Sequence, residues 1–124
     1  MALFLRGVRG ATTVERDEPE LILAATAELL RAMLEANALP DTDGVASILF
    51  TTTADLRSAF PAEAARRAGM VHVPLMCMQE IPVPGSLPRT VRVLLHLNTD
   101  KAQRDLRHVY LRDAARLRPD LAPS

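Results

Sequence analysis

The stretch TVRVLLHLN, residues 90–98, has the alternating pattern of a β-strand with one buried face. Successive side chains on a strand point to opposite sides of the sheet. The positions therefore divide into an aliphatic set and a mixed set, namely Val91, Val93, Leu95 and Leu97 against Thr90, Arg92, Leu94 and His96. The pattern predicts a strand that covers a core with one face and presents an arginine on the other.

Two earlier segments also predict strands. Residues 3–10 (LFLRGVRG) read as a strand with small breaks at Gly7 and Gly10. Residues 45–53 (VASILFTTT) are rich in residues that favour strands, so a buried strand is expected there.

A long helix is expected between these two strands. Asp17 and Glu20 have the spacing of a capping box, and Pro19 lies in the first turn, where its missing N–H costs little. Aliphatic side chains then recur at helical spacing. The predicted helix begins at Asp17 and ends near Asn37.

The remaining segments predict shorter elements. Residues 61–69 (PAEAARRAG) form a short helix with a glycine near its end, and residues 71–80 are extended around Pro74. Residues 107–111 (RHVYL) read as a short strand, and the chain from about residue 113 is expected to be a mobile tail.

These elements predict an α/β (α+β) fold in which one long helix covers one face of a mixed sheet. Residues 1–124 are expected to form a single domain. A single helical layer leaves the other sheet face uncovered. Packing that face against further copies of the chain is a natural way to bury it.

The composition excludes several classes of protein. Fifteen basic and fifteen acidic residues cancel, which provides no global field for nucleic acid or an anionic membrane. No apolar run approaches the ~18 residues of a membrane span, and arginines interrupt the N-terminal segment where an export signal needs its apolar core. The single cysteine, Cys77, suits a reducing compartment. A cytoplasmic location is expected.

Three charged residues stand out as candidates for binding or catalysis. Arg92 lies among aliphatic residues, and a buried guanidinium cannot shed its charge, so it needs an anionic partner. That partner is either a structural carboxylate or a ligand. The same two alternatives apply to Glu80, which follows an apolar stretch, while Arg9 is either a ligand-binding residue or a surface residue near a turn.

Several kinds of chemistry lack support in the sequence. His72, His96 and His108 do not have metal-ligand spacing and are interpreted as structural, so no metal or cofactor is expected. Cys77 has no neighbouring base to activate it and is interpreted as a small buried side chain. An enzyme with this inventory works by binding and electrostatics.

Four segments in order resemble the trimeric, single-function family of chorismate mutases. They are RGVRGATTVERD (6–17), DLRSAFPAEAAR (55–66), VPLMCMQE (73–80) and RHVYLRDAARLRPDL (107–121). The resemblance covers nearly the whole chain. It implies a homotrimer that packs its sheets into a barrel-like core, with an active site at each subunit interface.

The resemblance also implies an activity and a set of site residues. The family rearranges chorismate to prephenate on the route to phenylalanine and tyrosine, without a cofactor. Arg9 and Tyr110 match residues that bind a substrate carboxylate, Arg92 matches the arginine at the ether oxygen, and Glu80 and Cys77 match residues near the ring hydroxyl. Other matched positions line the pocket from the neighbouring subunit (Phe60, Ala62, Arg66, Leu75 and Met76) or belong to a mobile tail over its entrance (Leu117 and Arg118).

The chain departs from the family pattern at one pocket-rim position, because Glu63 stands where a lysine is expected.

Two rival interpretations remain open on the sequence: a non-catalytic module that binds carboxylates, and a structural oligomer whose arginines make interface salt bridges. The joint presence of Arg9, Glu80, Arg92 and Tyr110 favours the enzyme.

Overall fold

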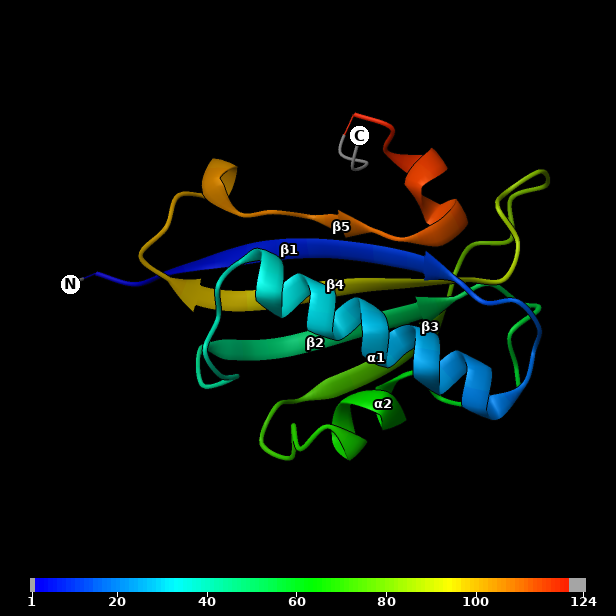
Figure 1. Ribbon diagram of the computed structural model, residues 1–124, viewed down its shortest axis with the longest axis horizontal. Helices are drawn as coiled ribbons and strands as arrows, with labels where there is room; N and C mark the ends of the chain where they lie inside the picture. The colour runs from blue at the N-terminus through cyan, green and yellow to red at the C-terminus, as the bar shows by residue number, and fades with distance from the viewer. Residues whose placement is uncertain (1, 121–124) are drawn as a thin grey trace.

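The computed structural model describes residues 2–120 and contains a five-stranded mixed sheet (Figure 1). The strand order is β3-β2-β4-β1-β5. The central strand β4 pairs antiparallel with β1 and β2, while the two edge strands pair parallel with their neighbours. The strands are β1 Phe4–Thr13, β2 Val45–Thr52, β3 Leu75–Gln79, β4 Thr90–Thr99 and β5 Val109–Tyr110. The predicted mixed α+β class is confirmed.

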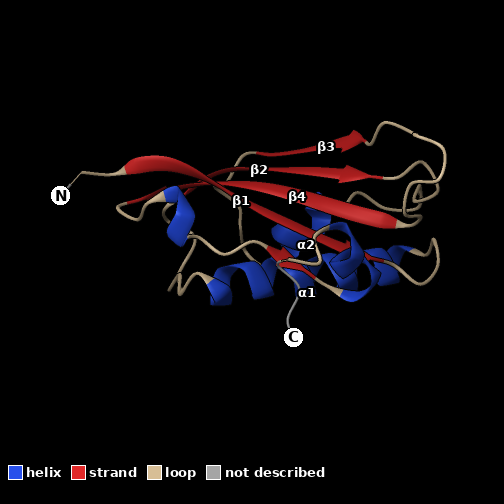
Figure 2. Ribbon diagram, turned by 90° about the horizontal axis from the view of Figure 1, so that it is seen from above, coloured by secondary structure: helices blue, strands red, loops and turns tan. Residues whose placement is uncertain are grey.

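The long helix α1, Pro19–Ala36, lies across one face of the sheet (Figure 2). Its buried side, which includes Leu29 and Met33, packs on the aliphatic face of β4 and on the neighbouring strands. The alternation predicted for residues 90–98 is confirmed from Val91 onward, since one set of β4 side chains is buried in this core and the other is partly exposed on the opposite face. Thr90, at the start of the strand, is buried although it belongs to the second set.

The predicted start of α1 is wrong by two residues. The helix begins at Pro19, its N-cap is Glu18, and no side chain caps it. Asp17 instead accepts three hydrogen bonds on Oδ1, from the backbone N–H groups of Arg57 and Ser58 and from the Ser58 hydroxyl. A long-range contact to the loop after β2 therefore replaces the local cap.

The predicted breaks in the first strand are also wrong. β1 continues through both glycines to Thr13, so Arg9 lies in the middle of the strand. A β-carbon at Gly10 would collide with the sulfur of Met33 and crowd Leu29. Gly10 therefore serves the close approach of α1 to the sheet and does not interrupt the strand.

Shorter elements complete the chain. The helix α2, Ala62–Arg67, ends before Gly69, whose positive φ of 92° reverses the chain as expected. Two short 3₁₀ helices follow β4, η1 at Gln103–Asp105 and η2 at Arg112–Leu117. The start of the predicted tail thus has regular structure, with Ala114 fully buried, and its last four residues lie outside the described range.

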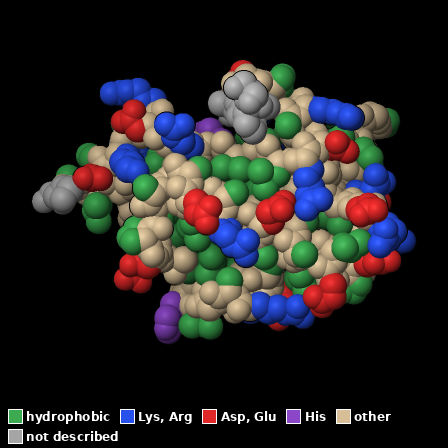
Figure 3. All heavy atoms as spheres, in the orientation of Figure 1, with side chains coloured by type: hydrophobic (Ala, Val, Ile, Leu, Met, Phe, Trp, Pro, Cys, Tyr) green, Lys and Arg blue, Asp and Glu red, His purple; other side chains and the backbone are tan. Residues whose placement is uncertain are grey.

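The two faces of the sheet differ in how far helices cover them. Figure 2 shows α1 and α2 on the same side of the sheet, whereas the other side has no such layer. Figure 3 shows the molecule from the α1 side, where charged side chains of both signs are interspersed. On the uncovered side, which we call the open face, Met76 and Met78 of β3 are exposed at 58% and 41%. No helix among the described residues is long and apolar enough to cross a membrane.

Candidate active site on the open sheet face

The register of the sheet brings the predicted site residues together on the open face. Arg92 on β4 lies between Thr51 on β2 and Ala11 on β1, and Ala11 in turn lies beside Tyr110 on β5. Arg92 and Tyr110 are thus two strands apart, or about 9–10 Å at the usual strand spacing. The small side chain of Ala11 separates them.

Arg9 occupies the next row of the same face. It pairs with Leu94, two residues beyond Arg92 on β4, so Arg9 and Arg92 are diagonal neighbours. Two arginines and a tyrosine are therefore the neighbours of Ala11 on this face, an arrangement that suits a ligand with more than one negative group.

Arg92 and Glu80 form an ion pair. Arg92 Nε lies 3.5 Å from Glu80 Oε2, with side-chain exposures of 26% and 32%. The geometry is too poor for a hydrogen bond, and Arg92 Nε is a buried nitrogen with no hydrogen-bond partner. The contact is therefore electrostatic, and it leaves hydrogen-bonding capacity on the guanidinium unused.

Thr51 holds the glutamate in place. Its hydroxyl donates a hydrogen bond to Glu80 Oε2, the same oxygen that faces Arg92. Thr51 is not among the site residues predicted from the sequence. A usable signal was its place in the predicted strand at residues 45–53, but the register that sets it opposite Arg92 becomes visible only in the folded sheet.

The β5 side of the site contains a compact polar cluster. Tyr110 is buried against Ala11, Ala114 and Leu117. Arg118 makes two hydrogen bonds to Asp120, at 3.1 and 2.9 Å. These bonds and the carboxylate charge raise the pKa of Arg118, and the nearby Tyr110 contributes in the same direction.

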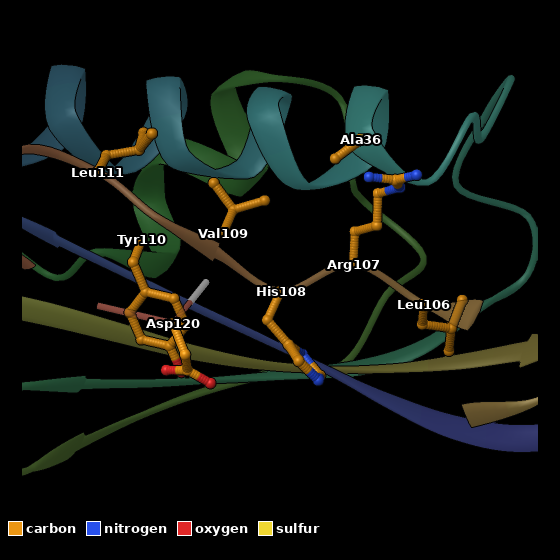
Figure 4. Close-up of a pocket in the computed structure, with 8 residues that line it drawn as sticks. All are labelled: Ala36, Leu106, Arg107, His108, Val109, Tyr110, Leu111 and Asp120. Atoms are coloured by element: carbon orange, nitrogen blue, oxygen red, sulfur yellow. The ribbon is translucent and has the colours of Figure 1, made fainter. Parts of the chain in front are cut away.

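His108 lies in this cluster and contacts Arg9 directly. Its Nδ1 accepts a hydrogen bond from the backbone N–H of Arg9 at 2.9 Å. Burial lowers the pKa of His108, and the charges of Arg118 and Arg9 lower it further. A cavity of about 470 Å³ opens here, and Figure 4 shows His108, Tyr110 and Asp120 on the side of β5 away from α1.

The residues predicted to act from a neighbouring subunit lie near the opposite edge of the sheet. Within one chain they do not meet Tyr110, because β3 and β5 are the two edge strands. Phe60 is 70% exposed, whereas Ala62, the first residue of α2, is buried. The set comprises Phe60, Ala62, Arg66, Leu75 and Met76. Glu63 pairs with Arg66 at 3.1 Å, so the unexpected carboxylate is partly neutralised within α2.

Cys77 differs from its neighbours on β3. It pairs with the buried Phe50 and packs against the hydrophobic core, but it is only partly buried, whereas a buried side chain was expected. Met76 and Met78, which pair with Leu49 and Thr51, lie on the open face. The thiol thus lies on the core side of β3, and Glu80 reaches Arg92 from just beyond the end of that strand.

The side chains of this site define a class of protein. It is one that binds a small anionic ligand on an open sheet face, with two arginines, a carboxylate and a phenol. Among residues 2–120, no group of three or more His, Cys, Asp or Glu side chains is placed to hold a metal ion. The two arginines can bind and stabilise negative charge, and Glu80 and Tyr110 can exchange hydrogen bonds with a ligand.

Comparisons with known proteins identify the family. The family model for chorismate mutase type I matches residues 5–121. A chorismate mutase AroH from Thermus thermophilus is 61% identical over 117 residues, which cover 94% of this chain and 96% of the relative. A chorismate mutase AroH from Bacillus subtilis is 46% identical over 121 residues, covering 97% of this chain and 94% of the relative.

A solved structure agrees with the sequence comparisons. A chorismate mutase from Clostridium thermocellum superposes with a TM-score of 0.85 at 51% identity, covering 87% of this chain and 96% of the other. The chain therefore belongs to the type I chorismate mutase family. The activity of that family is an isomerase activity, and it belongs to aromatic amino-acid biosynthesis.

Proposed function

We propose that the chain converts chorismate to prephenate on the open sheet face and that Arg92 supplies most of the rate enhancement. The observation that carries this proposal is the state of Arg92. Arg92 lies on the central strand β4, its Nε is buried without a hydrogen bond, and its ion pair with Glu80 is loose at 3.5 Å. A cation with unused donors is suited to a ligand oxygen.

The chemistry of the rearrangement explains why such a cation accelerates it. The C–O bond of the enol ether breaks ahead of C–C bond formation, so negative charge grows on the ether oxygen in the transition state. A fixed cation at that oxygen stabilises the transition state more than the ground state, and only such a difference raises the rate. The reaction is intramolecular, so the proposal includes no cofactor and no covalent intermediate.

Arg9 and Tyr110 have a different role in this proposal. Chorismate carries two carboxylates, and the reaction needs its folded conformer, in which the reacting carbons approach each other. Arg9 and Tyr110 flank Ala11 on the side away from Glu80. Binding carboxylate there while Arg92 binds the ether oxygen selects that conformer, which is a positioning effect.

Glu80 and the Cys77 segment are assigned to the ring hydroxyl. Glu80 has a second carboxylate oxygen that is free to accept a hydrogen bond from a ligand, because Oε2 serves Thr51 and Arg92. Glu80 also keeps Arg92 aligned. The segment with Leu117 and Arg118 is proposed to cover the entrance once substrate is bound.

We also propose that the site is completed by a second copy in a homotrimer. The open face carries apolar side chains that a single chain leaves uncovered, among them Leu49, Leu94, Met76 and Met78. Packing these faces together buries them and brings the β3 edge of one subunit, with Phe60 and Arg66, to the open face of the next. A cytoplasmic location is proposed from the free cysteine.

A direct assay tests the proposal. The purified chain is mixed with chorismate and the loss of its ultraviolet absorbance is followed, while sedimentation measures the oligomeric state. We expect rapid loss of absorbance and a trimer. A folded trimer that binds chorismate without converting it would support the rival carboxylate-binding module.

A further inference from the structure

Beyond its short pairing with β5, the outer edge of β1 has no neighbouring strand. Its backbone groups there are hydrogen-bonded by side chains. The regular pairing of β5 with β1 covers only Gly10 and Ala11. At Gly7, the side chain of Gln103 accepts from the backbone N–H and donates to the backbone carbonyl. At Arg9, the N–H is satisfied by Nδ1 of His108. The two side chains therefore replace main-chain partners along this edge.

The bond at Arg9 specifies the protonation state of His108. Nδ1 can accept a hydrogen bond only when it carries no proton, so the bond requires the neutral ring with its proton on Nε2. An imidazolium would point an N–H at the N–H of Arg9. Protonation therefore replaces an attraction with a repulsion at the residue proposed to bind a substrate carboxylate.

The charges around His108 act in both directions. Arg9 on β1 and Arg118 beyond η2 are cations whose charges reach the ring. Arg107, Asp120 and the phenol of Tyr110 line the same cavity (Figure 4), while α1 contributes the uncharged Ala36. Asp120 favours the imidazolium, but it is bound to Arg118 by two hydrogen bonds. The balance favours the neutral ring.

We propose that neutral His108 is a positioning residue for Arg9 and for the segment that carries Tyr110, and that its protonation loosens both. The inference rests on the proposed function, in that Arg9 and Tyr110 bind substrate. It adds a residue that touches neither the substrate nor the reacting atoms and acts through the backbone of Arg9.

The direction of the pH effect follows from burial and charge. The pKa of His108 is lowered below its ordinary value near 6.5. The unfolded chain thus binds more protons than the folded chain in the range just below pH 6.5, so stability rises with pH there. The stability that neutral His108 contributes is fully present above about pH 6.5. This stability is lost as the pH falls from there through the lowered pKa.

Two substitutions at His108 separate the ability of this side chain to accept the hydrogen bond from its ability to titrate. In His108→Asn the amide oxygen takes the place of Nδ1 and does not titrate, while His108→Leu removes the acceptor. His72→Asn is the matched control, because His72 is exposed and remote from β1 and β5. For each variant, kcat and KM are measured from pH 5 to 8, and the His108 pKa and Arg9 amide exchange are measured by NMR.

We expect KM of the wild type to rise as the pH falls through the NMR pKa of His108. His108→Leu should raise KM about 2- to 10-fold at pH 7.5 with kcat nearly unchanged, as for loss of one hydrogen bond that orients a binding residue. His108→Asn should restore KM at pH 7.5 and flatten its pH dependence. The control should behave as the wild type does.

Wild-type KM in a folded His108→Leu variant would overturn the inference. If the wild type does not convert chorismate, the proposed function fails, and the NMR measurement still decides the role of His108. In that case Arg9 amide exchange should accelerate as His108 protonates and in His108→Leu. Unchanged Arg9 exchange in both would contradict the positioning role.

Discussion

Arg92 Nε lies 3.5 Å from Glu80 Oε2, and among the described residues it is the one buried side-chain nitrogen or oxygen without a hydrogen bond. An unsatisfied buried donor normally costs about 1–3 kcal/mol. Here the register places Arg92 between Thr51 and Ala11, and neither neighbour accepts a hydrogen bond from Nε. The site is thus prepared for an external acceptor.

The Thr51 hydroxyl is expected to contribute to catalysis through Glu80. Thr51→Val removes the hydrogen bond to Glu80 Oε2 while nearly preserving volume, so Glu80 and then Arg92 lose their alignment. Because hydrogen bonds to charged groups contribute about 1.5–3 kcal/mol, we expect kcat/KM to fall at least 10-fold. Thr53→Val is not a suitable control, because the Thr53 hydroxyl accepts a hydrogen bond from the backbone N–H of Thr90. Thr42, half-buried in the loop before β2, is a better choice for a threonine-to-valine comparison.

Gly10 is expected to be required for the packing of α1. Gly10→Ala places a methyl group against Met33, and overpacking of this kind costs about 1–3 kcal/mol. Urea unfolding should show this loss, and the double variant with Met33→Val should recover part of it. Additive losses in the double variant would show that the two residues do not collide.

Asp17 is expected to stabilise the fold by joining the loop before α1 to the loop after β2. The Ser58 hydroxyl and then the backbone N–H groups of Arg57 and Ser58 lower the pKa of Asp17. A lowered carboxyl pKa gives stability that is present above the ordinary value near 3.8 and is lost as the pH falls below it. Asp17→Ala should therefore lower Tm at pH 7, and the difference should shrink below pH 4.

Glu15→Ala is the control for Asp17→Ala. Glu15 is a nearby exposed carboxylate that forms an ion pair with Arg16, which is also exposed. Surface pairs of this kind contribute little to stability. An equal loss of Tm in both variants would contradict a specific role for Asp17.

The shared site predicts complementation between two inactive chains. Arg92→Ala damages the open face, and Arg66→Glu damages the edge proposed to face the next subunit. In random mixed trimers, about a quarter of the interfaces combine two intact halves, so co-refolded chains should recover about a quarter of wild-type activity. A mixture as inactive as its components would place the whole site within one subunit.

The sequence predicted the sheet, the long helix and the four charged or phenolic site residues because each depends on a local pattern or a matching motif. It predicted a local cap at Asp17 and breaks at two glycines of β1, and both were wrong for the same reason. The partners of Asp17 and Gly10 are distant in sequence: Ser58 for the first and Met33 for the second. Spacing along the chain does not reveal them.

The residues that support the site could not be predicted from the sequence for a related reason. Thr51 and His108 have no distinctive motif, and each acquires its role by sheet register, opposite Arg92 in one case and beside Arg9 in the other. The sequence interpretation of His108 as structural agrees with its hydrogen bond to the backbone. The effect of His108 on Arg9 could not be predicted, because the sequence does not reveal which backbone group His108 contacts.

The most direct test of this account compares chorismate turnover by the wild type, Arg92→Ala and Arg92→Lys, with folding and oligomeric state verified for each. Loss of a preorganised donor to a developing oxyanion costs about 3–4 kcal/mol or more, so Arg92→Ala should lose at least about 10²–10³-fold in kcat while remaining a folded trimer. Arg92→Lys should not recover it, because the ammonium lacks the planar fork. Turnover by folded Arg92→Ala at the wild-type rate would contradict the central role of Arg92.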